Sequence, residues 1–273
     1  MILHCGKFQL DLSRPLVMGI VNVTPDSFSD GGRHLSHEAA ISHARRLVEE
    51  GADILDIGGE STRPGAAAVS EQEELQRVLP VIAGLRDAGV PLSIDTWKPA
   101  VMRAALQAGA SMVNDVNALQ ADGALAAVAS GDAAVCLMHK QGDPGTMQSE
   151  PRYRDVVAEV TEFLQARVMA VQAAGIARER IVVDPGFGFG KTLAHNLALL
   201  KSLSALSATG VPVLAGISRK SMLGALTGQD VEHRLSASIA AALIAVQNGA
   251  RIVRVHDVRE TVDALKIWNA ANS

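Results

Sequence analysis

The stretch LVMGIVNVTPDSFSDGGRHLSHEAAISHARRLVEEGADILDI, residues 16–57, decides the fold class. It opens with an apolar run that ends on Asn22, passes through a loop rich in Gly, Pro, Ser and Asp, and then carries a helical pattern to Gly51. A second apolar run follows at residues 53–57. This succession predicts a β-α-β unit, in which the crossover helix makes the two strands parallel and buries both faces of the sheet.

The same unit repeats along the rest of the sequence, and several helical patterns close on a glycine that can act as a C-cap. We predict eight strands, at residues 16–22, 53–57, 91–95, 112–115, 134–138, 180–184, 212–218 and 251–256. Eight such units favour closure into a single (β/α)8 TIM barrel, and 273 residues is a usual length for that fold. Because no linker or low-complexity block divides the chain, we predict one domain over residues 1–273.

Composition and charge exclude several classes of function. Hydrophobic residues make up 48% of the chain and aromatic residues only 3%, so we expect a core of aliphatic side chains. The net charge of −4, with scattered Lys and Arg, provides no basic face and argues against a nucleic-acid partner. No apolar run can cross a bilayer and no signal segment is evident, so we predict a cytoplasmic protein without a membrane partner. Cys5 and Cys136 do not suggest a disulfide framework, and Cys136 is expected to be an apolar filler.

Polar residues gather where the predicted strands end. In a barrel of this kind, reactive groups lie at the C-terminal strand ends and in the loops that follow them, so these residues predict an active site. Arg254 and His256 project from the same face of one strand. The strand-end residues are Asn22, Asp95, Asn114, Asp184, Ser218, Lys220, Arg254 and His256.

The segment DPGFGFGKT, residues 184–192, follows a predicted strand but does not match a nucleotide-binding loop. Pro185 stands where a Walker A loop needs glycine, and the spacing is not G-x-G-x-x-G. We expect the glycines to let the backbone approach a planar ligand, with Phe187 or Phe189 as a stacking wall.

Two strand-end carboxylates, Asp95 and Asp184, need a partner if they are buried. Asp95 precedes TWKPAV and either caps the following helix or binds a ligand. For Asp184 we favour ligand contact, because DPGFGFG does not begin a helix at once.

Cations follow the seventh strand in ISRKSMLG, residues 217–224, which is either a solvated helix start or part of an anion site. Arg254 and His256 on the next strand favour the anion site, because loops after strands seven and eight of barrels often bind phosphate. His256 is expected to donate to an anion, with acid–base chemistry as the second interpretation. Asn22 offers an oxygen ligand for Mg²⁺, whereas no histidine has zinc-ligand spacing.

Two long loops, at residues 21–32 and 58–68, are rich in Gly, Pro, Ser and Asp. Long loops at the active end of a barrel usually carry function, so we interpret both as lids over the site. Phe28 in the first loop is expected to cover a flat ligand, and Arg63 in the second is expected to approach the anion site.

From about Leu16 to about Trp268, the chain resembles the dihydropteroate synthases of folate biosynthesis. The matching segments, in order, are MGIVNVTPDSFSDGG, DIGGESTRPGA, SIDTWKP, GASMVNDV, CLMHKQG, VVDPGFGFGKT, GISRKSMLG and RVHDV. Trp97 and Lys140 depart from the residues frequent in the family, and neither departure weakens the likeness.

This resemblance implies a transferase that joins 6-hydroxymethyl-7,8-dihydropterin diphosphate to p-aminobenzoate and releases diphosphate, with Mg²⁺ as cofactor and a homodimer as the assembly. Because departure of diphosphate is the harder step, we predict an SN1-like substitution aided by cations at the diphosphate. Two alternatives stay open: a pterin-binding methyltransferase barrel, and a noncatalytic pterin-binding paralogue.

The resemblance also implies roles for individual residues. It places the pterin at Asp95, Asn114, Met138, Asp184 and Lys220. It places p-aminobenzoate at Phe28, Thr62, Arg63, Pro64, Phe189, Lys220 and Ser221. It places the diphosphate at Asn22, Arg63, Arg254 and His256, with Asn22 also at the metal. The residues expected to carry the chemistry are Asn22, Arg63, Lys220, Arg254 and His256.

Overall fold

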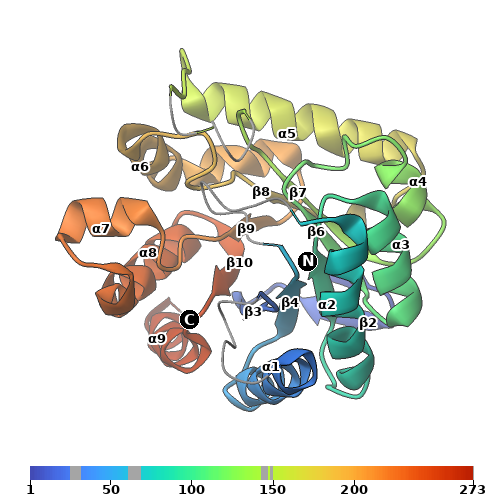
Figure 1. Cartoon of the computed structure of the whole chain (residues 1–273). Coiled ribbons are helices and arrows are strands. Elements are labelled where there is room, and N and C mark those ends of the chain that lie inside the picture. Colours follow the sequence, from blue (N-terminus) through green and yellow to red (C-terminus); the bar gives the residue numbers. More distant parts are fainter. Residues whose placement is uncertain (25–31, 61–68, 143–146, 148–149, 273) are drawn as a thin grey trace.

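The computed structural model of the chain describes residues 1–24, 32–60, 69–142, 147 and 150–272. Eight parallel strands close into a barrel and helices surround it, which confirms the predicted (β/α)8 TIM barrel (Figure 1). The strands adjoin in the order β10-β3-β4-β5-β6-β7-β8-β9. Their bounds are β3 Leu16–Asn22, β4 Ile54–Gly58, β5 Leu92–Asp95, β6 Met112–Asp115, β7 Ala134–Met138, β8 Ile181–Asp184, β9 Val213–Ala215 and β10 Ala250–Val255.

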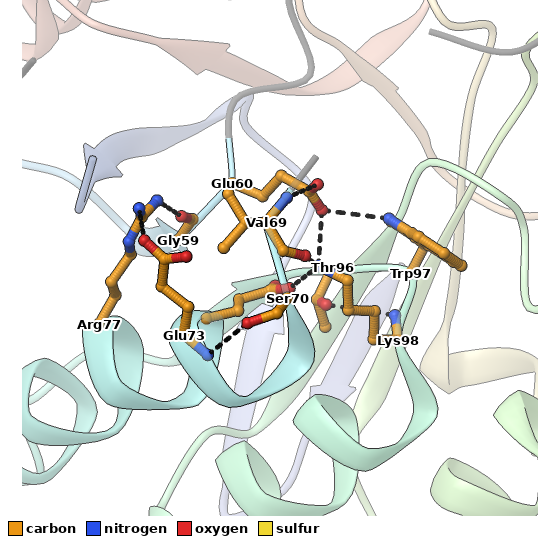
Figure 2. Close-up of polar contacts among 10 residues, drawn as sticks. Gly59, Glu60, Val69, Ser70, Glu73, Arg77, Thr96, Trp97 and Lys98 are labelled. Atoms are coloured by element: carbon orange, nitrogen blue, oxygen red, sulfur yellow. Dashed lines mark hydrogen bonds and ion pairs between the residues drawn. The ribbon is translucent and has the colours of Figure 1, made fainter. Parts of the chain in front are cut away.

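The helices that follow the strands cover the outside of the barrel (Figure 1). They are α1 Gly32–Glu49, α2 Glu71–Gly84, α3 Pro99–Ala108, α4 Ala124–Ala129, α5 Val156–Ala173, α6 Leu193–Lys201, α7 Ser221–Thr227, α8 Leu235–Gln247 and α9 Val258–Asn272, with short 3-10 segments at Arg178–Arg180, Leu203–Thr209 and Val231–His233. Several helices begin at a capping residue. For example, the hydroxyl of Ser70 accepts a hydrogen bond from the backbone N–H of Glu73 and so caps α2 (Figure 2). In the described part of the chain, no helix has the length and apolarity needed to cross a membrane.

The strands alternate between two apolar environments, as expected for strands buried on both faces. One set of side chains packs between the barrel and its helices. The other set fills the barrel interior and includes Met18, Ile54 and Cys136, none of which is exposed. Cys136 is therefore the apolar filler that the sequence predicted, and its thiol is free.

A hairpin at the N-terminus, which we did not predict, closes the bottom of the barrel. Strands β1 (Ile2–Cys5) and β2 (Phe8–Asp11) pair antiparallel around Gly6, whose φ of +57° suits glycine. Leu3 and Cys5 pack with barrel-interior residues, and the backbone N–H of Gly6 donates to Asp132 O just before β7. The hairpin therefore seals the apolar end of the interior and leaves the opposite end for polar groups.

Predicted and observed strand limits agree within one residue, except at the seventh strand. The predicted strand at 212–218 ends already at Ala215. The chain then turns through Arg219, a non-glycine residue with a φ of +57°, and Lys220 N donates to Ile217 O. This turn directs Lys220 back across the strand ends and starts α7.

Candidate active site

Inward-pointing side chains become polar at the C-terminal ends of the strands, which we call the barrel mouth. Asp95 on β5 is in register with Asn114 on β6. Met138 on β7 is in register with Asp184 on β8. Asn114, Met138 and Asp184 are all buried. The residues assigned to the pterin on strands β5 to β8 therefore lie on adjacent strands at one end of the barrel.

Arg254 on β10 reaches across the barrel to two carboxylates. Its Nε donates to Asp56 Oδ2 at 2.5 Å and its Nη2 donates to Asp95 Oδ2 at 2.7 Å. Burial alone would lower the pKa of Arg254, but Asp56 and Asp95 outweigh burial and raise that pKa. Burial raises the pKa of Asp95, and the charge of Arg254 opposes that increase. Asp95 is thus an ion-pair partner; it does not cap α3, whose N-cap is Lys98.

Asp56 is a site residue that our sequence analysis missed. It lies inside β4, is fully buried, and accepts a hydrogen bond of 3.0 Å from Asn114 Nδ2. Its other oxygen, Oδ1, is buried and makes no hydrogen bond to any residue in the described ranges. The sequence could have revealed Asp56, because it is a carboxylate within the apolar run ILDIG. A charged side chain in a buried strand requires a partner.

Asp184 and Arg254 converge on one point of the mouth. A Cβ atom added at Gly216, between strands β8 and β10, would lie 3.8 Å from Asp184 Oδ2 and 3.8 Å from Arg254 Cβ. Asp184 Oδ1 accepts a hydrogen bond of 2.7 Å from Gly186 N. The other oxygen, Oδ2, is the one that lies near Gly216. Burial raises the pKa of Asp184, and the charges of Lys220 and Arg254 oppose that increase. The acidic and cationic groups therefore meet at one end of the barrel.

Lys220 covers the same region from the turn before α7. Its ammonium donates to Phe187 O and lies 4.6 Å from the centre of the Phe189 ring. Burial lowers the pKa of Lys220 to about 8, although Asp184 opposes this shift. Of the two aromatic residues offered as a stacking wall, Phe187 is fully buried in the core, so only Phe189, which is half-buried, can face a ligand.

Two of the glycines of DPGFGFGKT make close contacts within the chain itself. A Cβ atom at Gly186 would lie 1.9 Å from His139 O, and one at Gly190 would lie 2.2 Å from Gln141 O. Both glycines have positive φ and pack directly on the backbone that follows β7. They are required for contact between two loops of the chain itself, and the prediction that they admit a planar ligand is not needed to explain them.

The remaining described site residues lie around these groups. Ser218 Oγ is 3.0 Å from His256 Nδ1 and also accepts from His256 N, which joins the ends of the last two strands. Ser221 is exposed at the start of α7. Asn22, half-buried, ends β3, and its side chain makes no hydrogen bond within the described ranges. Phe28, Thr62, Arg63 and Pro64, like most of the two predicted lids, lie outside the described residues.

This arrangement can accept N–H donors of a ligand at its carboxylates and attract an anionic tail at its cations. Asp56, Asp95 and Asp184 supply carboxylate oxygens, while Asn114 supplies an amide that can turn a donor or an acceptor to a ligand. Arg254 and Lys220 bring two positive charges to the three carboxylates, so some carboxylate oxygens have no cationic partner among these residues. N–H groups of a flat heterocycle would satisfy the unmatched acceptors, and the cations would attract the tail.

Comparisons with known proteins agree with this chemistry. The profile of a family described as pterin binding enzyme matches residues 18–256. The dihydropteroate synthase of Neisseria meningitidis serogroup C is 54% identical over 272 residues, which span 98% of this chain and 96% of the relative. The structure of the Xanthomonas albilineans dihydropteroate synthase with 4-aminobenzoic acid matches with a TM-score of 0.94 and 56% identity, covering 100% of this chain and 98% of that one. The Burkholderia cenocepacia enzyme complexed with 7,8-dihydropteroate matches with a TM-score of 0.91 and 53% identity, covering 99% and 96%.

Proposed function

Because the chain belongs to the pterin-binding enzymes, and among them to the dihydropteroate synthases, we propose that its barrel mouth holds the pterin at its acidic groups and the diphosphate at its cations. The chain is a transferase that joins 6-hydroxymethyl-7,8-dihydropterin diphosphate to p-aminobenzoate and yields 7,8-dihydropteroate and diphosphate. The observation that carries the residue assignment is the convergence of Asp184 and Arg254 on Gly216.

The pterin edge is held by complementary donors and acceptors. Asp184 accepts two adjacent N–H groups of the ring, because its Oδ2 lies near Gly216 and its Oδ1 keeps one free lone pair beside the Gly186 bond. Asn114 and Lys220 meet the remaining polar positions, Asp95 lies beside them, and Met138 packs against the ring face. Asp56 acts through Arg254 and Asn114, to which it is directly hydrogen-bonded.

We assign the diphosphate to Asn22, Arg254 and His256, and the family likeness adds Arg63, which lies outside the described residues. Asn22 fits a magnesium site, because its amide oxygen is uncommitted among the described residues and Mg²⁺ needs few protein ligands when phosphates and waters complete its shell. When bound, Mg²⁺ would neutralise charge on the leaving oxygens. The p-aminobenzoate is assigned to Phe189, Lys220 and Ser221. The family likeness adds Phe28, Thr62, Arg63 and Pro64, which lie outside the described residues.

Substitution at the pterin methylene is dissociative. The C–O bond to diphosphate breaks first, and its electron pair leaves with the diphosphate, where the charges of Arg254 and Lys220 and donation from His256 stabilise it. The pterin ring delocalises the positive charge left on the methylene carbon. The neutral aromatic amine then forms the C–N bond and releases its extra proton to solvent, so the enzyme needs no strong base.

The decisive assay measures diphosphate release from the pterin substrate, with and without p-aminobenzoate and Mg²⁺. We expect release and 7,8-dihydropteroate formation to stop when EDTA removes the metal and to return with added Mg²⁺. Asn22→Ala should raise the Mg²⁺ concentration for half-maximal rate by about tenfold or more. Asn272→Ala at the end of α9, far from the mouth, should leave it unchanged. A noncatalytic paralogue would bind pterin and release no diphosphate. If the rate did not depend on the metal, Asn22 would not act as a magnesium ligand.

Turnover should also depend on the charge of Lys220. Its pKa of about 8 means that the ammonium prevails below this pH and is lost above it, so kcat/KM should fall as the pH rises through about 8. Lys220→Arg keeps the positive charge at all working pH values, and we expect its weaker activity to lack that alkaline decline. A pH profile that is identical in the wild type and in Lys220→Arg would assign the decline to another group.

We also propose that the chain forms a homodimer through α7 and α8. Leu226, Val231, Leu235 and Ile244 are large apolar side chains exposed on or between these helices. Exposed large apolar side chains on neighbouring helices are typical of a surface that another subunit covers. The half-buried Ile239 lies on the same helix α8.

A further inference from the structure

A buried lysine that has no part in the proposed reaction, Lys191, lies in the glycine-rich segment after β8. It is only 3% exposed. Its Nζ lies 2.9 Å from His139 Nδ1 and donates to Phe189 O at 3.0 Å, with a longer contact of 3.4 Å to His139 O. Lys191 therefore connects the first residue after β7 to the backbone carbonyl of Phe189.

The residue at the β7 end of this connection is firmly held. His139 N donates to Asp184 O at 3.0 Å, and Gly186 packs so closely on His139 O that a Cβ atom there would lie 1.9 Å away. The ring of His139 is buried and meets the ring of Phe163 on α5 edge-on, with 5.0 Å between ring centres. Lys191 is thus hydrogen-bonded to a fixed part of the barrel mouth.

The residue at the other end, Phe189, presents its ring to the site. The ring centre lies 4.6 Å from Lys220 Nζ. Both backbone polar groups of Phe189 are engaged, since its N–H donates to Gly186 O at 3.1 Å and its carbonyl accepts from Lys191. Because the rotamers open to a side chain depend on its backbone, Lys191 helps to set where the Phe189 ring lies relative to Lys220.

Other side chains hold the two neighbours of Phe189. Gly188 N donates to Asn196 Oδ1 at 2.7 Å, and Tyr153 OH donates to Gly190 O at 2.9 Å. Loss of the Lys191 ammonium would therefore free the carbonyl of Phe189 while the segment stays attached on both sides. The effect of such a change should be confined to the position of Phe189.

Lys191 acts here by hydrogen bonding, which does not require its charge. Burial lowers the pKa of Lys191 to about 7, an effect that Asp184 opposes and Lys220 reinforces. Burial, together with the charge of Lys191, lowers the pKa of His139 to about 3, so this ring is neutral and its Nδ1 can accept. A neutral amine still has two N–H donors, which suffice for His139 Nδ1 and Phe189 O.

We propose that Lys191 is a positioning residue for the second substrate. It holds the backbone of Phe189, and thereby the ring against which p-aminobenzoate packs. This inference rests on the proposed function, in which Phe189 contacts p-aminobenzoate. It assigns to Lys191 no contact with either substrate, only with Phe189 and His139.

Steady-state kinetics with both substrates test the proposal. Lys191→Met keeps a side chain of similar length and removes the N–H donors. We expect its KM for p-aminobenzoate to rise about tenfold, because small misplacements of binding groups are costly. The KM for the pterin diphosphate and the affinity for 6-hydroxymethylpterin, measured by calorimetry, should change by no more than about twofold, since Asp184 keeps its hydrogen bonds to Gly186 N and His139 N.

A double-mutant cycle shows whether Lys191 acts through the Phe189 ring. Phe189→Leu alone should raise the KM for p-aminobenzoate. If Lys191 acts by placing that ring, adding Lys191→Met to Phe189→Leu should raise this KM further by no more than about twofold. Effects that multiplied in full would mean that Lys191 acts by another route, and the proposal would be wrong.

Lys191→Met leaves His139 Nδ1 buried without a donor and can destabilise the protein, so a second variant is required. Lys191→Met/His139→Leu removes that unpaired group. It should regain part of the urea midpoint lost in Lys191→Met and keep the raised KM for p-aminobenzoate.

Arg180→Met is a matched control at the opposite end of β8. The Arg180 guanidinium also donates to backbone carbonyls, those of Ala133 and Val128. Its loss should lower the urea midpoint and leave both KM values near those of the wild type. An equal rise in the KM for p-aminobenzoate in Arg180→Met would attribute the effect of Lys191→Met to general loosening of the barrel.

The outcomes separate this proposal from the proposed function. If folded Lys191→Met or its double variant with His139→Leu has a wild-type KM for p-aminobenzoate, or if both KM values rise equally, Lys191 does not position the second substrate. If Phe189→Leu leaves the KM for p-aminobenzoate unchanged, or if the wild type forms no dihydropteroate, the proposed function fails at that point, and the positioning role fails with it.

Discussion

Asp184→Asn should lower kcat/KM about a thousandfold while the protein keeps its fold. A site built to accept N–H groups discriminates strongly when its acceptor is lost, because buried donors of the ligand then stay unpaired. The substituted amide would retain one oxygen, which the Gly186 N–H already uses at 2.7 Å, and would turn its NH₂ group toward the pterin N–H groups. The loss should appear in steady-state kinetics and, in parallel, as weaker binding of 6-hydroxymethylpterin by calorimetry.

A matched control is available at the end of another barrel strand. Asp115 ends β6 and is fully buried, but its oxygens accept from Asn117 N and Leu119 N, both at 2.7 Å, and so stabilise the turn after the strand. Asp115→Asn should reduce the free energy of unfolding and leave pterin affinity within a few-fold of the wild type. If Asp184→Asn bound pterin as tightly as the wild type, the bidentate contact would be wrong and the pterin would have to lie elsewhere in the mouth.

The barrel was predictable because its strands are buried on both faces and therefore read as continuous apolar runs between helical patterns. The polar strand ends were predictable for the same reason, since Asp95, Asn114 and Asp184 each stop such a run. The N-terminal hairpin was not, because each of its strands is only four residues long and its partner residues lie on the barrel floor.

Two parts of the site depend on three-dimensional pairing that spacing along the chain does not encode. Asp56 is 198 residues from Arg254, and only closure of the barrel brings their side chains to 2.5 Å. Likewise, the Gly186 and Gly190 contacts arise from the packing of two loops, which the motif alone does not reveal.

Arg254→Met should be the most destabilising change at the mouth and should also abolish most turnover. It removes the cation shared by Asp56, which is fully buried, and Asp95. Removing one partner of a buried ion pair typically lowers the free energy of unfolding by about 3–5 kcal/mol, because the remaining charge stays desolvated. The lost positive charge at the leaving diphosphate should reduce kcat by about a hundredfold or more. Urea denaturation and steady-state kinetics measure the two effects separately.

Arg254→Met/Asp56→Asn shows whether the two effects have one origin. Neutralising Asp56 removes the most buried of the unpaired carboxylates, so the double variant should recover part of the stability lost in Arg254→Met. It should recover no turnover, since the cation at the diphosphate is still missing. Lys266→Met, which breaks an exposed ion pair with Asp263 on α9, should affect neither quantity. If turnover returned together with stability, Arg254 would act only by holding the carboxylates, and stabilisation of the departing diphosphate would have to come from His256, Lys220 and the loop residues.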